Sequence, residues 1–454
     1  MDTFVASSFG MFVMTLFQGL LTAPSRQTFT FLACGWALTT GRHTITTYLW
    51  LTGAATVKHF SRFYVFLGGP FYQARGRMWA CIIRHAAQLV PADVPIVIEF
   101  DDTTKKKAGP HIEGGDRYRN GAGSARQEYR TLWGLNFVLG VMRVPLRLWP
   151  GHAVTLPIGL ELYLKEPHAQ QRHLPYRTRS QLARHILDGV IAQLPGRPIR
   201  VLADGGYATK DFLQDLPAAV EVISRFLISG KLYALPTPPA RPRRGPRPRK
   251  GPLLGSPKTF LQQEHGWLPH PSEAGAQVQA WVGLWHTVLP GRLVRVVAVR
   301  RTPGQRGKPP GRHQPPPSVE AFFTTDLSLH MEDVLQQYRD RWAIEIAIRD
   351  ANAFDGLGHE QCRKLPRIVG ANTLRLGLAA ARTLWFIEQV GRAHALNLHR
   401  YRPWYWQKRA PSQLDIVWAC QESLHEAGVF PIPRFTPDLA EKPEEPTHAL
   451  PPAA

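Results

Sequence analysis

The order of strand-like and helix-like segments in the middle of the chain constrains its fold more than any other feature. Three apolar, β-favouring runs separated by turns come first: VPIVIEF (94–100), WGLNFVLGVM (133–142) and AVTLPIGLELYL (153–164). Helical and strand patterns then alternate, at 178–193, 198–204, 209–216 and 221–228. A meander of strands followed by alternating helices and strands predicts an α/β core built on one mixed sheet.

Two basic, proline-rich stretches interrupt this pattern, at 236–252 and 300–317. Proline fixes φ and lacks a backbone donor, so no helix or strand continues through them. The segment between them, 278–299, predicts a β-hairpin that turns at Pro290 and Gly291. We therefore expect a β-rich insertion carried on basic, flexible connectors. The connectors either contact DNA phosphates or are solvated linkers, and their clustered cations favour contact: Arg241, Arg243, Arg244, Arg247, Arg249 and Lys250.

Helical patterns dominate both ends of the chain. In the first 90 residues, candidate helices lie at about 8–21, 26–38, 43–53 and 71–89. Residues 39–53 resemble a small helix-turn-helix element, and a plain helical subdomain is the alternative. The chain is thus predicted to contain a helical N-terminal domain that is a candidate for DNA binding (1–90), the first part of the core (91–235), the insertion (236–318), the second part of the core with the helix that carries Glu345 (319–375), C-terminal helices (376–430) and a disordered tail (431–454).

Composition favours a polyanionic partner. The 454 residues include 55 Lys and Arg against 34 Asp and Glu, a formal net charge of +21. Nucleic acid is the simplest such partner, and the alternative is an arginine-rich composition without one. The apolar segment 9–21 is too short to span a bilayer. The four cysteines are far apart, so neither a disulfide framework nor structural zinc is expected, and His359 and Cys362 are interpreted as ordinary residues. We expect a soluble protein of the bacterial cytoplasm, associated with the nucleoid and not with a membrane.

Three carboxylates occupy positions suited to metal-dependent chemistry. Asp101 and Asp204 each follow a predicted strand, and Glu345 lies in a predicted helix. Functional groups gather at the carboxyl ends of strands in open α/β sheets, and oxygen ligands suit Mg²⁺ or Mn²⁺. Two such ions, about 3.5–4 Å apart, would serve phosphodiester chemistry. Each carboxylate alone is as compatible with a turn, a cap or a solvated surface. Asp102 is the alternative to Asp101, and Lys105, Lys106 and Lys107 are expected to face a phosphate chain.

The helical pattern around Glu345 places unlike polar groups on one face. With Tyr338 at 0°, Arg341 falls near −60°, Glu345 near −20° and Asn352 near −40°, all approximate values from the helical period. A core face would be apolar there, so a functional face is indicated. Trp342 lies beside it at about 40° and either stacks on an unpaired or flipped base or packs against the sheet.

These motifs carry a resemblance. YRDRWAIE (338–345) matches the Y-x2-R-x3-E signature of IS4-type transposases, and the chain resembles the IS701-like or DDE superfamily endonuclease branch in its DDT motif (101–103). The strand-D-x-G-Tyr/Phe motif of that family matches 204–207. The resemblance implies an RNase H-like fold, a metal triad of Asp101, Asp204 and Glu345, and a β insertion before the glutamate. The family signature ends in a lysine where this chain has Asn352, and Arg349, roughly one turn away, could supply the missing charge.

The expected function is that of an insertion-sequence transposase. Such an enzyme would cut the ends of its element and join the 3′-hydroxyl to double-stranded target DNA, acting with two Mg²⁺ or Mn²⁺ ions and as a homodimer on DNA. Tyr338, Arg341, Trp342, Arg349 and Asn352 would contact DNA. The alternatives are an RNase H-like nuclease that binds no element ends, a decayed or domesticated copy that binds DNA without transposing, and a noncatalytic basic DNA-binding protein.

Overall fold

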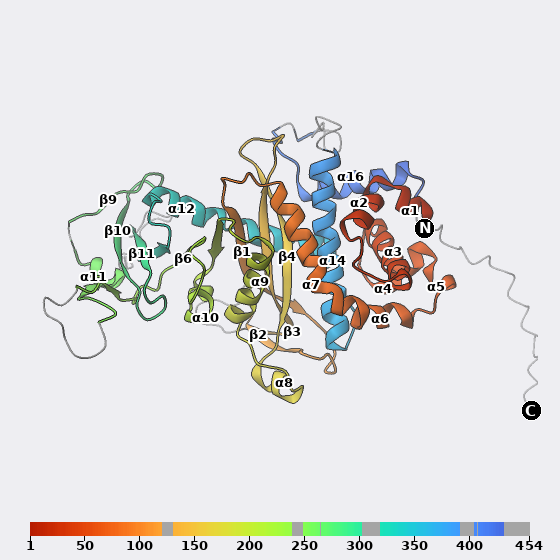
Figure 1. The fold of residues 1–454 in the computed structure, drawn as a ribbon, viewed down its shortest axis with the longest axis horizontal. Coiled ribbons are helices and arrows are strands. Elements are labelled where there is room, and N and C mark those ends of the chain that lie inside the picture. The colour runs from red at the N-terminus through yellow and green to blue at the C-terminus, as the bar shows by residue number, and fades with distance from the viewer. Residues whose placement is uncertain are drawn as a thin grey trace, which may run out of the picture.

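The computed structural model describes residues 1–119, 130–237, 248–263, 265–301, 318–390, 404–405 and 407–430. The predicted disordered tail and the connector residues Arg241, Arg243, Arg244 and Arg247 lie outside these ranges. Within them, the chain forms one mixed sheet flanked by helices (Figure 1). The predicted α/β class is confirmed.

Five strands form the centre of the sheet, in the spatial order β4-β3-β1-β5-β6. They are β1 (Ile96–Lys106), β3 (Thr131–Pro145), β4 (Ala153–Tyr163), β5 (Ile199–Ala203) and β6 (Val220–Arg225). The meander β1-β3-β4 is antiparallel, whereas β5 and β6 run parallel to β1. An antiparallel meander of three strands, with two further strands added parallel to its first strand, is the arrangement expected of an RNase H-like fold.

Strand β1 is longer than the sequence indicates. Its parallel pairing with β5 ends at Phe100↔Ala203, but its antiparallel pairing with β3 continues to Lys106↔Gly134. The prediction that the strand ends at Asp101 is therefore wrong. A polar segment remains in the ladder because β3 supplies backbone partners beyond the point where β5 stops. Asp101 lies at that point, where one neighbour of β1 ends and the other goes on.

The predicted hairpin forms and joins the same sheet. It consists of β10 (Ala276–Leu284) and β11 (Leu293–Arg301), and β12 (Ser318–Thr324) pairs with both β11 and β6. Short elements complete this end of the sheet: β7 (Leu232–Tyr233), β8 (Leu253–Gly255), α11 (Pro257–Phe260) and β9 (Leu268–Pro269). Figure 1 shows the insertion at the end of the molecule opposite the N-terminal helices. The hairpin thus extends the core sheet directly.

The helix that carries Glu345 is divided in two. α12 (Met331–Asp340) and α13 (Ala343–Asp350) are separated by Arg341 and Trp342, whose backbone N–H groups bond three residues back instead of four. A π-helical turn (Ala351–Asp355) follows α13. The single regular helix that the sequence analysis assumed from Tyr338 to Asn352 is therefore wrong, because the chain tightens at Arg341 and widens after Asp350. On the sheet's other side α9 (Arg179–Gln193) packs against β3 and β4, with α10 (Lys210–Leu213) beside it.

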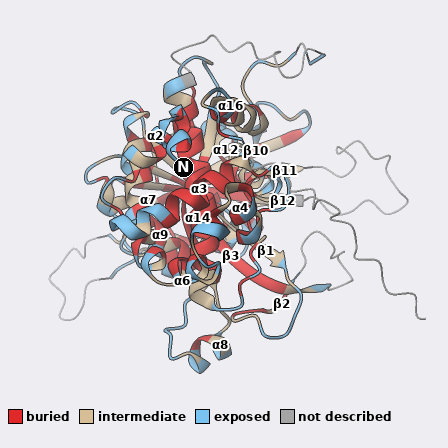
Figure 2. Cartoon of the chain, turned by 90° about the vertical axis from the view of Figure 1, so that its right-hand side faces the viewer, coloured by how far each residue is buried: buried red, intermediate tan, exposed pale blue. Residues whose placement is uncertain are grey.

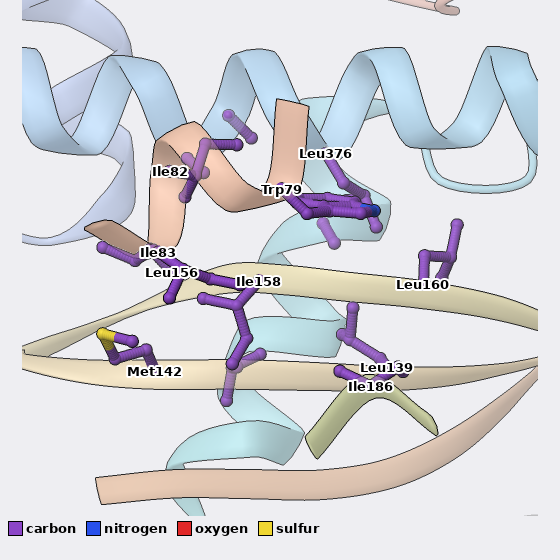
Figure 3. Packing of buried hydrophobic residues seen from close by; sticks show 14 of the residues in the cluster. Trp79, Ile82, Ile83, Leu139, Met142, Leu156, Ile158, Leu160, Ile186 and Leu376 are labelled. Atoms are coloured by element: carbon purple, nitrogen blue, oxygen red, sulfur yellow. The ribbon is translucent and has the colours of Figure 1, made fainter. Parts of the chain in front are cut away.

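One long helix joins the two ends of the chain. α14 (Leu365–Trp385) packs against β4 and against the N-terminal helices α2 (Ser8–Leu16), α6 (Ser61–Gly68) and α7 (Pro70–Gln88). α14 is buried from Ile368 to Trp385, and Figure 2 shows it beneath the outer helices. In Figure 3, Trp79 and Ile82 of α7 and Leu376 of α14 lie over side chains from β3 and β4. The helix runs unbroken past residue 375, where a domain boundary was expected.

The remaining helices complete the N-terminal and C-terminal parts: α1 (Asp2–Ala6), α3 (Ala23–Leu38), α4 (Ile45–Thr52), α5 (Ala54–Val57) and α16 (Gln413–Glu426). The core is completed by β2 (Asp116–Arg119) and α8 (Glu166–Gln171). The helices expected at 26–38, 43–53 and 71–89 are present, and the one expected at 8–21 ends at Leu16. Among the described helices, none combines the length and the apolarity that crossing a bilayer would require.

Candidate active site

Asp101 and Asp204 follow neighbouring positions on two parallel strands. β1 and β5 pair up to Phe100↔Ala203, and each aspartate is the next residue in its chain. Neighbouring strands lie about 4.8 Å apart, so the two backbones bring the aspartates to one place at the carboxyl edge of the parallel strands. This is the part of an open α/β sheet where functional groups gather.

The strand geometry separates Asp101 from Asp102. Asn136 Nδ2 donates a hydrogen bond of 2.8 Å to Asp102 Oδ2, and Arg179 Nε of α9 lies 3.2 Å from the same oxygen. Asp101 Oδ2 instead lies 3.9 Å from Arg341 Nη1. Successive side chains of a strand point to opposite faces, so Asp102 faces α9 and Asp101 faces the α12–α13 junction. Of the two carboxylates, Asp101 is the one that shares a face with Glu345.

The predicted polar face of 338–345 meets both aspartates. Arg341 Nη2 donates a hydrogen bond of 3.1 Å to Glu345 Oε1, while the other end of the guanidinium approaches Asp101. Tyr338 Oη donates to Asp204 Oδ1 at 3.3 Å. The tyrosine ring is held in place by Phe322 of β12, with ring centroids 4.5 Å apart. Residues three and four apart on the helical segment thus bring a phenol, a guanidinium and a third carboxylate to the aspartates.

Burial makes Asp101 costly to ionise. It raises the pKa of this carboxyl to about 6, and the neighbouring carboxylates of Asp102 and Asp204 act in the same direction. The Asp102 backbone N–H, which donates to Asp101 Oδ1 at 2.8 Å, and the Arg341 guanidinium lower the same pKa. A carboxylate in this condition is stabilised by any further cation that approaches it.

The donor set suits a hard divalent cation. Asp101, Asp204 and Glu345 offer only oxygen atoms, which Mg²⁺ and Mn²⁺ prefer. Within the described residues, however, no three acidic, histidine or cysteine side chains lie near enough to one another to bind one ion as they stand. The Arg341 guanidinium lies between Asp101 and Glu345 and supplies positive charge there. The chemistry of the donor atoms therefore fits the expected metal, with the two aspartates at adjacent strand ends and Arg341 between Asp101 and Glu345.

The three lysines beyond Asp101 have separate environments. Lys105 Nζ donates to Asn352 Oδ1, and burial lowers the pKa of Lys105 to about 8. Lys106 is exposed. Lys107 is almost fully buried, and its Nζ lies 2.5 Å from Glu360 Oε1. They therefore do not form one row of cations, although Lys105 brings a positive charge to Asn352.

Trp342, just before α13, and Arg349, near the end of α13, lie away from the carboxylates of the candidate site. Their side chains are 59% and 69% exposed, and both line a cavity of about 560 Å³ together with Ile346, Arg143 and Arg339. Packing of Trp342 against the sheet, one of its two expected roles, is therefore wrong. Arg349 donates to the Asp350 carboxylate at 2.8 and 3.0 Å.

Arg249 and Lys250, the connector cations that the structure describes, are exposed in the insertion, at the far end of the sheet. The Lys250 ammonium lies 4.1 Å from the centre of the Tyr233 ring.

A second carboxylate on the Asp101 face was missed by the sequence analysis. Glu99 precedes Asp101 by two residues on β1 and is fully buried. Arg143 Nη2 donates to Glu99 Oε1 at 2.5 Å and to the Asp340 carbonyl at 2.6 Å, so it joins β1 and β3 to the end of α12. Burial raises the pKa of Glu99 to about 7, whereas Arg143 and the Ile344 backbone N–H lower it. A lone acid inside the apolar run VPIVIEF was the available signal.

Comparison with known proteins agrees with this geometry. A family model described as DDE superfamily endonuclease matches residues 15–284, more than half of the chain. The matched range contains Asp101 and Asp204 and ends before Glu345. The comparison with curated proteins gave no significant match.

Proposed function

Because the chain belongs to the DDE superfamily endonucleases, we propose that it is a DNA transposase that cuts the ends of its element and joins the 3′-hydroxyl to target DNA. One observation carries this proposal: Arg341 contacts both Asp101 and Glu345, while Tyr338 of the same helical segment contacts Asp204. Three carboxylates that are far apart in the sequence are thus contacted by two residues of one helical segment, which supports their assignment as the acidic triad of a DDE enzyme.

The proposed metal ligands are Asp101, Asp204 and Glu345. Two Mg²⁺ or Mn²⁺ ions, when bound there, would activate the attacking hydroxyl and stabilise the leaving oxygen of an in-line displacement at phosphorus. Tyr338 fixes the orientation of Asp204 through its hydroxyl hydrogen bond. Arg341 neutralises the carboxylates before DNA arrives. Its guanidinium is then well placed to turn toward the phosphate that is cut, because its fork of donors matches phosphate oxygens.

Double-stranded DNA is the proposed partner, bound by a homodimer. Beside the carboxylates, Arg341, Lys105 and Asn352 would contact the backbone near the cut, with the exposed Lys106 at the end of β1. Lys107, which was expected to face phosphate as well, is instead buried against Glu360. Trp342 is exposed and lines a cavity together with three arginines, which suits stacking on an unpaired base. Arg349, Arg249 and Lys250 would add contacts to phosphates, and so would Arg241, Arg243, Arg244 and Arg247 of the connector.

A decayed copy that binds DNA without cutting it is the second candidate, because Asn352 replaces the lysine of the family signature. The Lys105 hydrogen bond to Asn352 speaks against decay. It places the Lys105 ammonium of β1 beside Asn352, so β1 supplies the positive charge that the lysine of the family signature would carry. This contact is more direct than the compensation by Arg349 that the sequence suggested.

The test uses the purified chain, Mg²⁺, and a duplex that carries the inverted repeats found in the DNA flanking the gene. Release of the element end and its covalent joining to a plasmid would support a transposase. Cutting without joining would favour a nuclease. Binding without cutting, restored to cutting by Asn352→Lys, would favour the decayed copy.

A further inference from the structure

A basic recess lies where β1 continues beyond the candidate active site. It has a volume of about 540 Å³ and is lined by three segments that are distant in the sequence. They are the α3–α4 turn with Arg42, the end of β1 and its following loop with Lys106 and His111, and the segment 358–363 with Arg363. The N-terminal helices and the catalytic core thus share one concave surface.

The recess is positive because its acidic residue is already neutralised. The side chains of Arg42, Lys106, His111 and Arg363 belong to exposed residues. Glu360 also lines the recess, but it is buried and lies 2.5 Å from Lys107 Nζ and 3.6 Å from Arg375 Nη1. Among the described lining residues, Glu360 is the sole acid, so the exposed Arg42, Lys106 and Arg363 face no competing carboxylate there. Such a surface suits a polyanion.

The backbone of the α3–α4 turn is rigidly held. Arg375 Nη2 of α14 donates to the His43 carbonyl at 2.7 Å, and the His43 ring hydrogen-bonds to the Tyr48 hydroxyl at 3.1 Å. The neighbouring residue Arg42 is therefore carried on a turn that a buried network fixes to the core. The following helix α4 has eight residues, with Ile45, Tyr48 and Leu49 buried against the protein. In this helix-turn-helix-like segment, the turn and not the second helix faces the recess.

The position of the recess relates it to the cut. Lys106 follows Asp101 by five residues on the same strand, a distance of roughly 16 Å at the usual rise of a strand. Duplex DNA advances 3.4 Å per base pair, so this distance corresponds to about five base pairs. Between them, Lys105 contacts Asn352 next to the catalytic helix. Lys107, which by the alternation of side chains along a strand lies on the Asp101 face, also lines the recess. A continuous duplex leaving the carboxylates along β1 would reach the recess.

We propose that the recess formed by Arg42, Lys106, His111 and Arg363 binds the sugar–phosphate backbone of the duplex about five base pairs from the phosphate that is cut. The inference rests on the proposed function, since it takes the position of the cut from Asp101 and Asp204. It gives the N-terminal helices a role in holding DNA on the catalytic domain through a turn, without insertion of α4 into a groove.

The test compares the double variant Arg42→Gln/Arg363→Gln with wild type and with Arg26→Gln. Arg26 is an exposed arginine near the start of α3, roughly 18 Å along the helix from its end at Leu38, and does not line the recess. The probes are duplexes with the inverted-repeat end from the gene's flanks. One series is extended in two-base-pair steps on the element side of the cut and a second series on the flanking side. Affinity is measured from 50 to 300 mM salt.

With ten base pairs beyond the cut on the relevant side, the double variant should bind on the order of tenfold more weakly at 0.1 M salt, and its log–log salt slope should be smaller by about 1.8. With two base pairs there, it should bind like wild type, and Arg26→Gln should do so throughout. Equal affinity of the double variant and Arg26→Gln on every probe would overturn the proposal that the recess binds DNA. A loss that did not depend on duplex length would also overturn it. Cleavage by wild type in the same experiment would still support the proposed function. If wild type binds the long duplex without cutting it, the proposed enzymatic function is refuted. The salt slopes of wild type and the double variant would still test whether the recess binds DNA.

Discussion

Two clusters of carboxylates and guanidinium groups in this molecule are chemically alike but differ in solvent exposure: one is partly exposed (the open cluster) and the other is buried (the closed cluster). One consists of Asp101, Asp204 and Glu345 around Arg341. The other lies beneath the N-terminal helices, where Glu360 pairs with Arg375 and Asp355 pairs with Arg382. Side chains of the second cluster are at most 4% exposed, whereas Asp101 and Glu345 are 26% and 34% exposed.

Closure explains what each cluster can do. In the buried cluster, Asn372 Nδ2 donates to Glu360 at 2.8 Å and Arg382 donates to Asp355 at 2.6 Å, so each carboxylate has short, permanent partners. In the open cluster, the Arg341 contact to Asp101 is 3.9 Å long. The same residue types therefore fasten α14 to the core in one place and remain partly exposed in the other, where we propose that they bind metal.

The largest expected effect is the loss of cleavage in the open cluster. Asp101→Ala, Asp204→Ala and Glu345→Ala should each lower the cleavage rate at least about a thousandfold, which is about 4 kcal/mol of barrier, because each removes a proposed metal ligand. DNA affinity should change little, since it is mainly electrostatic. Rates and affinities on the same duplex check this. Asp102→Asn is the control, and full activity in any alanine variant would remove that residue from the triad.

The buried cluster should respond in stability instead. Arg375→Ala removes a fully buried guanidinium that pairs with Glu360 and donates to the Tyr48 hydroxyl and the His43 carbonyl, and breaking such a buried network typically costs about 3–5 kcal/mol. Chemical denaturation should show this loss, whereas Glu345→Ala should unfold within about 0.5 kcal/mol of wild type, as expected for a partly exposed position. If Glu345→Ala proved as destabilising as Arg375→Ala, the distinction between an open and a closed cluster would fail.

Glu99 connects the comparison to catalysis as a positioning residue. Glu99→Gln keeps the shape of the side chain but weakens its charged contact with Arg143, so the end of α12 and hence Glu345 are held less firmly over Asp101. We expect roughly tenfold slower cleavage, about 1.4 kcal/mol of barrier, with more Mg²⁺ needed for half-maximal rate and unchanged DNA affinity. A lower stability with an unchanged Mg²⁺ requirement would show that Glu99 acts only in folding.

The smallest expected effect is a pH dependence of stability from His43, whose backbone carbonyl accepts a hydrogen bond from Arg375 of the buried cluster. Burial lowers the pKa of His43 to about 3, and the Arg375 charge acts in the same direction. The unfolded chain therefore takes up a proton at His43 near pH 6.5 that the folded chain refuses, so stability falls as pH drops below that value. From pH 6.5 to 5.5, wild type should lose about 1 kcal/mol relative to His43→Gln, measured by denaturation at both values. Parallel curves for the two proteins would contradict this.

Local patterns in the sequence were sufficient for the elements and for the contents of the polar face. The β-favouring runs became β1, β3 and β4, and the hairpin over 278–299 formed where expected. Tyr338, Arg341 and Glu345 lie together because a helical period of about 3.6 residues is a local property that survives the tightening at Arg341. That Asp101 and Asp204 would meet could be foreseen because each follows a strand of one parallel pair.

Partners distant in the sequence decided the rest. β1 passes Asp101 because β3 pairs with it, and this alternation turned Asp101 toward Arg341 and Asp102 toward Arg179. Lys105 hydrogen-bonds to Asn352 and Lys107 forms an ion pair with Glu360, although each partner is about 250 residues away along the chain. The exposure of Trp342 and the burial of Glu99 were settled in the same way. The direction in which a side chain leaves a helix or strand follows from the local periodicity of that element, which the neighbouring residues determine. Its contact partner depends instead on tertiary packing and on the free-energy cost of leaving a buried charge unpaired.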